Sequence, residues 1–287
     1  MRRLVGAILV VAMLPAPAGG SDGRTMAIEV ARLPGGLLTV PVEVNAAGPL
    51  HLLLDTGSTR TMVTPAAAAR LGLAVTAGAR VVTPAGTREA GESLIGRLRF
   101  GPVTVTGLPV VVAPLDAIDA GGLPLDGVLG ADVLRRASLL IDASALRVVA
   151  STAPGFSARL AGARVPLSVD PLGRMRVSVT TGGPGGVPLI LLADSGASMV
   201  ALFGEAAALA EDAGARRAAG TADGRRGSRV GILRDLAIGA ARWPRLPAVL
   251  LPGRVRSGHD GLLPLTALGP VGVDAARGEL VFVAVRR

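Results

Sequence analysis

An apolar run that leads straight into Asp-(Thr/Ser)-Gly occurs twice in this chain, and this repeat most constrains its fold. Residues 50–57 read LHLLLDTG and residues 187–196 read VPLILLADSG. An apolar run of this length favours a buried strand, and glycine allows a tight turn directly after the aspartate. The repeat therefore predicts two equivalent loops, which carry Asp55 and Asp194 at the ends of two buried strands.

The similarity between the two copies extends beyond the loops. An Asp-Gly pair followed by two apolar residues lies at residues 126–127 and again at residues 260–261, at a similar distance from each loop. Matching order and spacing indicate a duplicated lobe, because such agreement is improbable by chance. We expect an N-terminal lobe at residues 26–150 and a C-terminal lobe at residues 163–287.

A short helix is expected after each loop. In the first copy Thr64 can cap a helix that has Pro65 at its first position and stops at Gly72. In the second copy the alanine-rich residues 205–212 are followed by Gly214, which is typical of a helix end.

The remaining sequence favours strands joined by turns. Glycine (40 residues) and proline (21 residues) are frequent, and short apolar segments alternate with turn residues. Residues 83–87 and 221–225 occupy equivalent places in the two copies and are expected to be hairpin tips. We therefore predict an all-β protein of two homologous, barrel-like lobes with short helices and a cleft between the lobes.

The N-terminus has the parts of a secretory signal. Arg2 and Arg3 precede an apolar stretch at residues 4–14, and Ala16-Pro17-Ala18 provides small residues for cleavage. We expect residues 1–18 to be removed, and the mature chain to be periplasmic or secreted without a stable membrane anchor. The chain has no cysteine, so core packing alone must hold it together.

The positive charge of the chain does not indicate a nucleic-acid-binding protein. The formal net charge is +9, but every basic residue is an arginine and the arginines are scattered. Aromatic residues make up only 2 %, which leaves few partners for stacking on bases. We expect peptide or protein substrates and no nucleic acid.

Two aspartates brought together can perform acid–base chemistry without a metal. Like charges a few ångströms apart cannot both ionise easily, so one proton is shared between the two carboxyl groups. One group can then activate water while the other protonates the substrate. Asp55 and Asp194 are therefore the candidate catalytic pair, and we expect no cofactor and no metal.

These motifs resemble those of the pepsin-like and retropepsin-like aspartic proteases, in a two-lobed bacterial form. The resemblance covers residues 26–282 and implies that Asp55 and Asp194 are catalytic. It implies that the hydroxyl groups of Thr56 and Ser195 link the lobes, and that Ser58 hydrogen-bonds the outer oxygen of Asp55. Gly57 and Gly196 would present amide groups to the carboxylates. A flap is implied at residues 81–92, with a tip formed by Thr83, Pro84, Ala85, Gly86 and Thr87.

The sequence departs from this family pattern at three points. Ala197 stands where the first loop has Ser58, Pro264 replaces an expected glycine, and the chain lacks the flap tyrosine of pepsins. The expected function is an exported aspartic endopeptidase that acts as a monomer. The departures leave open a catalytically inactive peptide-binding protein, and a processing or scaffold partner in an assembly is a third alternative.

Other residues have simpler interpretations. His51 and His259 lie near serines, but no nucleophile-elbow sequence accompanies them, which argues against a Ser-His-Asp triad. Asp126 and Asp260 precede glycines, and we expect them to act in turns or caps. Asp132 is expected at the start of a helix.

Overall fold

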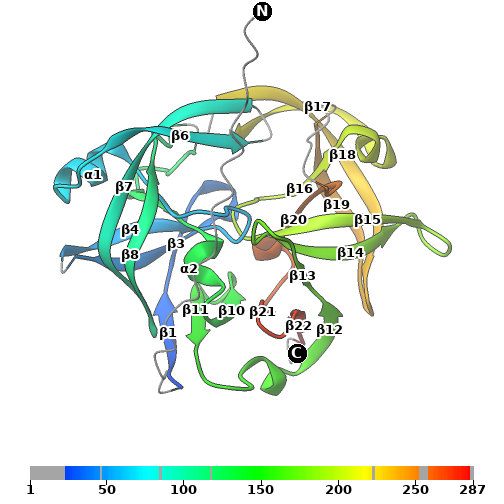
Figure 1. The fold of residues 1–287 in the computed structure, drawn as a ribbon. Helices are drawn as coiled ribbons and strands as arrows, with labels where there is room; N and C mark the ends of the chain where they lie inside the picture. Colours follow the sequence, from blue (N-terminus) through cyan, green and yellow to red (C-terminus); the bar gives the residue numbers. More distant parts are fainter. Residues whose placement is uncertain are drawn as a thin grey trace, which may run out of the picture.

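The computed structural model describes residues 23–45, 47–83, 86–116, 118–221, 224–251 and 258–284 and contains three β-sheets with a few short helices (Figure 1). The predicted signal peptide at residues 1–18 lies outside the described residues. None of the described helices is long and apolar enough to span a membrane.

The first copy of the repeat forms an eight-stranded sheet. Its strands, in spatial order, are β2 (Ala31–Arg32), β3 (Leu38–Val44), β4 (Ala47–Leu54), β9 (Gly127–Leu129), β5 (Met62–Val63), β8 (Val103–Val112), β7 (Gly86–Phe100) and β6 (Thr76–Thr83).

The second copy forms an eight-stranded sheet of the same topology. Its strands, in the equivalent order, are β13 (Ser168–Val169), β14 (Met175–Thr181), β15 (Val187–Asp194), β20 (Gly261–Pro264), β16 (Val200–Phe203), β19 (Ala241–Leu251), β18 (Gly224–Ile238) and β17 (Glu211–Thr221). Every strand has a counterpart at the same position in the first sheet, which confirms the predicted duplication.

A six-stranded antiparallel sheet connects the two halves at the bottom of Figure 1. Each half contributes three strands, and β10 pairs with β21 at the centre, where Leu140 lies opposite Gly272. The strands, in order, are β1 (Thr25–Glu29), β11 (Arg147–Ser151), β10 (Ser138–Asp142), β21 (Val271–Asp274), β22 (Glu279–Val283) and β12 (Gly162–Pro166).

The helices are short and fill gaps between strands. The α-helices are α1 (Pro65–Arg70) and α2 (Ala131–Leu134), and the 3₁₀ turns are η1 (Pro34–Gly36), η2 (Ser157–Arg159), η3 (Gly204–Leu209) and η4 (Leu265–Ala267). Helix α1 begins as predicted, because the Thr64 side chain accepts a hydrogen bond from the Ala67 amide and Pro65 follows directly. The predicted all-β fold with short helices is confirmed.

The helix expected at residues 205–212 is shorter than predicted and is the 3₁₀ turn η3 (Gly204–Leu209). Strand β17 already begins at Glu211, so the last part of the predicted helix belongs to the sheet. Gly214, with a φ of +67°, lies in the irregular part of β17 between Asp212 and Ala215.

Candidate active site

The two Asp-(Thr/Ser)-Gly loops meet where the two halves of the molecule adjoin. Strand β4 delivers Asp55 and strand β15 ends at Asp194, and each strand runs parallel to a short strand of its own half. The Asp55 amide donates a hydrogen bond to the Leu129 carbonyl oxygen over 3.1 Å. In the second half Asp194 lies opposite Pro264 in the parallel pairing of β15 with β20, so the proline does not prevent this strand from pairing beside its loop.

Four reciprocal hydrogen bonds link the loops. The Thr56 hydroxyl donates to the Ala193 carbonyl oxygen (2.8 Å) and accepts from the Ser195 amide (3.0 Å). The Ser195 hydroxyl donates to the Leu54 carbonyl oxygen (2.8 Å) and accepts from the Thr56 amide (3.0 Å). Both side chains are fully buried. The structure therefore brings together the two hydroxyl groups that the resemblance implied, in a symmetric arrangement.

The glycine that follows Thr56 or Ser195 leaves room for the aspartate carboxyl group of the other half. A Cβ atom on Gly57 would lie 2.6 Å from Cγ of Asp194, and a Cβ atom on Gly196 would lie 2.5 Å from Cγ of Asp55. Real Cβ atoms do not come this close to other heavy atoms, so glycine is required at both positions. The amide groups of these glycines also bind the aspartates of their own loops, over 2.9 Å and 2.7 Å.

The two carboxyl groups interact with each other and have altered acidity. Burial raises the pKa of Asp194 well above its usual range, and the negative charge of Asp55 raises it further. Burial also raises the pKa of Asp55, while amide hydrogen bonds from Ser58 and Gly57 and the contact with Asp194 oppose that increase. An arrangement of this kind holds one proton between two carboxyl groups and can serve as acid and base together.

The two segments of sequence that carry these loops are matched by a family model. The model describes aspartyl proteases and matches residues 40–133 and 175–266, one segment for each half of the chain. This chain belongs to the aspartyl protease family. Comparison with curated proteins finds no match.

Two solved structures are similar to this chain at low sequence identity. Basic 7S globulin from soybean is 14% identical, with a TM-score of 0.48, over 90% of this chain and 94% of that chain. A retropepsin-like aspartic protease from Rickettsia conorii is 19% identical, with a TM-score of 0.35, over 45% of this chain and 93% of that chain.

Ser58 hydrogen-bonds the Asp55 carboxylate as the resemblance implied, and it does so through its amide. The Ser58 amide binds Asp55 Oδ1 over 2.9 Å, but the hydroxyl donates to the carbonyl oxygen of Arg60. The tight turn after Asp55 places that carbonyl within reach of the hydroxyl. Ala197, the counterpart of Ser58, also offers its amide to Asp194, so the second loop keeps this contact without a hydroxyl.

The predicted flap is a hairpin in the structure. Strands β6 and β7 pair from Thr76 with Glu92 to Thr83 with Gly86, and Thr87 pairs with Val82. Pro84 and Ala85 lie outside the described residues. Ala79 on β6 and Leu53 on β4 belong to one hydrophobic cluster, and Leu53 precedes Asp55 by two residues. The hairpin therefore covers the sheet face from which Asp55 projects, although its role as a flap stays a prediction.

The aspartates of the two Asp-Gly pairs have matching structural roles, which differ from the expected turns or caps because each carboxylate binds a strand amide. The Asp126 carboxylate accepts a hydrogen bond from the His51 amide over 2.9 Å, and Asp260 accepts from the Ile190 amide over 2.8 Å. Asp126 also forms an ion pair with Arg70 over 2.6 Å. These contacts extend the strands that carry the loops.

A buried polar pair behind the first loop was not anticipated in the sequence. Asp132, expected only at a helix start, accepts hydrogen bonds from the Thr61 amide (2.8 Å) and hydroxyl (2.7 Å). The Thr61 hydroxyl accepts in turn from the Gly130 amide over 3.2 Å. Burial raises the pKa of Asp132, while Thr61 opposes the increase. The pair shows no counterpart in the second repeat, where Val200 takes the place of Thr61, so repeat comparison alone gives no signal for it.

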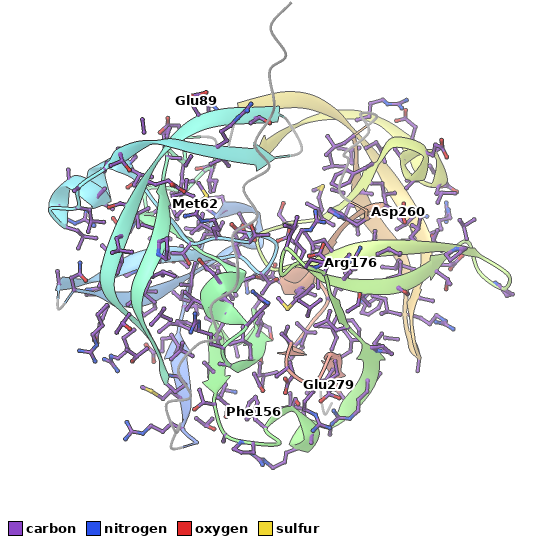
Figure 2. All side chains as sticks on the ribbon, in the orientation of Figure 1. Met62, Glu89, Phe156, Arg176, Asp260 and Glu279 are labelled. Carbon is purple, nitrogen blue, oxygen red and sulfur yellow. The ribbon has the colours of Figure 1, made fainter. Side chains whose placement is uncertain are left out.

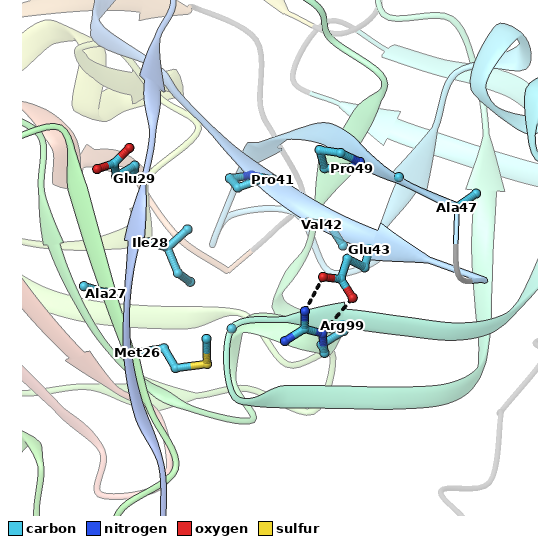
Figure 3. Close-up of a pocket in the computed structure, with 12 residues that line it drawn as sticks. Met26, Ala27, Ile28, Glu29, Pro41, Val42, Glu43, Ala47, Pro49 and Arg99 are labelled. Atoms are coloured by element: carbon cyan, nitrogen blue, oxygen red, sulfur yellow. Dashed lines mark hydrogen bonds and ion pairs between the residues drawn. The ribbon is translucent and has the colours of Figure 1, made fainter.

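The pocket in Figure 3 is separate from the aspartate pair. It has a volume of about 560 Å³ and lies between β1 and the β3–β4 hairpin, beside the ion pair of Glu43 and Arg99. Its lining includes neither Asp55 nor Asp194. Among the described residues, no group of three or more histidine, aspartate or glutamate side chains could hold a metal ion.

Proposed function

We propose that this chain is an exported aspartic endopeptidase in which Asp55 and Asp194 activate a water molecule through a shared proton. The observation that supports this most strongly is the meeting of the two carboxyl groups, each packed against the glycine of the opposite loop. Burial and the charge of Asp55 raise the pKa of Asp194 there. The ordered loops around the pair require no rearrangement to hold this geometry.

The proposed reaction needs no covalent intermediate. The ionised carboxylate takes a proton from water as the water oxygen attacks the carbonyl carbon of a peptide bond. The protonated carboxyl group gives its proton to the carbonyl oxygen, which yields a tetrahedral diol. A proton then passes to the amide nitrogen, the carbon–nitrogen bond breaks, and the pair returns to its singly protonated state.

The first test is cleavage of a mixed peptide library by the purified mature chain from acidic to neutral pH, with and without a statine-type inhibitor. We expect cleavage that the inhibitor suppresses. A folded protein that cleaves nothing at any of these pH values would contradict the proposal. Retention of uncleaved peptides in that case would favour the inactive peptide-binding alternative. Pro264 and the absence of tyrosine are the two sequence features that motivate this alternative.

Export is a separate part of the proposal and needs its own test. It rests on the positive, apolar and small-residue pattern of residues 1–18. Expression of the full chain in a Gram-negative host, followed by fractionation and N-terminal sequencing, should recover a periplasmic protein that starts near residue 19. Recovery of an intact N-terminus from the cytoplasm alone would contradict export.

A further inference from the structure

Arg176 is a cationic residue on the face of the second sheet that carries Asp194. On β14, Met175 and Val177 point into the core, so strand alternation places Arg176 on the opposite face. Arg176 pairs directly with Leu192 on β15, and Leu192 precedes Asp194 by two residues on the same face. Two residues along a strand span about 7 Å, so Arg176 lies close to the aspartate pair. Figure 2 shows it near the middle of the molecule, where the two halves meet.

The guanidinium group of Arg176 has unused hydrogen-bonding capacity. Within the described part of the chain, its one side-chain hydrogen bond runs from Nη1 to the Gly258 carbonyl oxygen, over 3.2 Å. Its Nε is buried and has no acceptor. By contrast, the nearby Arg174 is paired with the Asp170 carboxylate over 2.6 Å. A buried donor without an acceptor costs free energy. A carboxylate that accepted hydrogen bonds from Arg176 would remove this cost.

The acidic residue next to Gly258 in the sequence is engaged elsewhere. Asp260 accepts a hydrogen bond from the Ile190 amide over 2.8 Å. No carboxylate among the described residues forms an ion pair with Arg176. Within the described part of the chain, no ion pair therefore neutralises the charge of Arg176.

The first half has no equivalent charge. Thr39 pairs with Leu53 just as Arg176 pairs with Leu192, and Thr39 is buried and uncharged. A peptide that lies across the two halves is itself asymmetric about its scissile bond. An arginine in one half alone is thus suited to recognise a group on one side of that bond.

We propose that Arg176 binds a carboxylate of the peptide substrate, within about three residues of the scissile bond on one side, since an extended chain rises about 3.3 Å per residue. The Nε–Nη2 edge of a guanidinium fits a carboxylate through two parallel hydrogen bonds. Nε is covered in this structure, so binding requires the flexible side chain to shift. This inference rests on the proposed peptidase function and adds the substrate class that the site prefers.

The test compares matched peptide pairs on the full mature protein. One pair of libraries differs only in Asp or Glu against Asn or Gln near the scissile bond, and the other pair differs only in a free against an amidated C-terminus. These arms separate an acidic side chain from a terminal carboxylate. The variants are Arg176→Gln, Arg176→Lys and the control Arg147→Gln. The control removes an exposed arginine from β11 in the six-stranded sheet. Thermal unfolding of each variant verifies its fold.

We expect the acidic member of one pair to be cleaved with a kcat/KM roughly tenfold higher or more, since hydrogen bonds to charged groups have this strength. Arg176→Gln should abolish that preference while Arg147→Gln keeps it, and Arg176→Lys should keep part of it, because lysine retains the charge without the planar fork. A purely structural Arg176 would lower the cleavage of acidic and amide peptides equally.

Cleavage without any acidic preference would overturn this inference and leave the peptidase proposal standing. If no peptide is cleaved, binding of the same fluorescent peptides to the wild-type chain decides the matter separately. Tighter binding of acidic peptides that Arg176→Gln weakens would support the inference while the peptidase proposal fails. Equal binding of all peptides would overturn it.

Discussion

Gly57 lies directly against the carboxyl group of Asp194, so that a Cβ atom at Gly57 would stand 2.6 Å from Cγ of that aspartate. The reciprocal contact joins Gly196 to Asp55 at 2.5 Å. Each carboxyl group is therefore positioned by its own loop and by the absence of a side chain on the other loop. The spacing of the aspartate pair is a property of both halves together.

Gly57→Ala should reduce peptide cleavage by about 100-fold, because a displacement of about 1 Å is enough to cost that much. The added methyl group must push the Asp194 carboxyl group away from Asp55. Steady-state kinetics on a cleaved peptide measure the effect. Gly96→Ala is the matched control, because its Cβ would meet only the Asn45 side chain, at 3.1 Å. Full activity of Gly57→Ala would show that the pair tolerates displacement.

Thr56→Val should lower the free energy of unfolding by about 2–4 kcal/mol, since it leaves two buried main-chain groups without partners. These are the Ser195 amide and the Ala193 carbonyl oxygen. Urea unfolding followed by circular dichroism provides the measurement, and Thr56→Ser should recover most of the loss. Thr104→Val, at an exposed position of β8, is the control for the substitution itself. A change below about 0.5 kcal/mol, typical of surface sites, would contradict the structural role of these hydrogen bonds.

Thr61→Val should destabilise the first half by about 1–3 kcal/mol, because it removes a hydrogen bond to the partly buried Asp132 carboxylate. Thr61→Val combined with Asp132→Leu should cost less than the sum of the two single changes, because the Thr61 hydroxyl and the Asp132 carboxylate are each other's partners. The second half already has a valine, Val200, at the equivalent place. A double-mutant cycle with Asp132→Leu measures the coupling. Simple additivity of the two changes would argue against a paired unit.

Asp194→Asn should raise the thermal stability of the fold at neutral pH. The pKa of Asp194 is raised well above its usual range in the folded chain and is ordinary in the unfolded chain. Folded protein then binds more protons than unfolded protein between these two values, so the stability of the wild type falls as pH rises through that window. The gain in Tm from Asp194→Asn should thus be smallest below about pH 3.8 and increase toward neutral pH.

The matched control for this titration is Asp235→Asn, an exposed position with a φ of +50° where asparagine is equally well suited. A Tm gain for Asp194→Asn that stays level with pH would mean that the buried charge has no energetic cost.

Patterns that depend on neighbouring residues could be predicted from the sequence. The duplication, the two loops, the Thr64 cap and the hairpin of β6 and β7 all follow from local residue order. The alanine-rich stretch at residues 205–212 favours a single helix in the sequence, but the structure divides it between the 3₁₀ turn η3 and the start of β17, a boundary that residue type alone does not specify.

Contacts between distant segments were beyond the reach of sequence patterns. The Ser58 hydroxyl binds the Arg60 carbonyl oxygen because of the way the loop turns, which residue type alone does not specify. Thr61 and Asp132 are far apart in the sequence, and several strands lie between them along the chain. Arg176 is one of many scattered arginines in the sequence, and only its pairing with Leu192 places it beside Asp194.

Cleavage by single aspartate variants tests the central claim most directly. The wild type, Asp55→Asn, Asp194→Asn and the exposed control Asp235→Asn should be compared on the best library peptide at its optimal pH. We predict that each of the two loop variants stays folded and loses at least about 100-fold in kcat, the range typical of a lost general acid or base. Asp235→Asn should match the wild type. Cleavage retained by either loop variant would contradict the assignment of Asp55 and Asp194 as the catalytic pair.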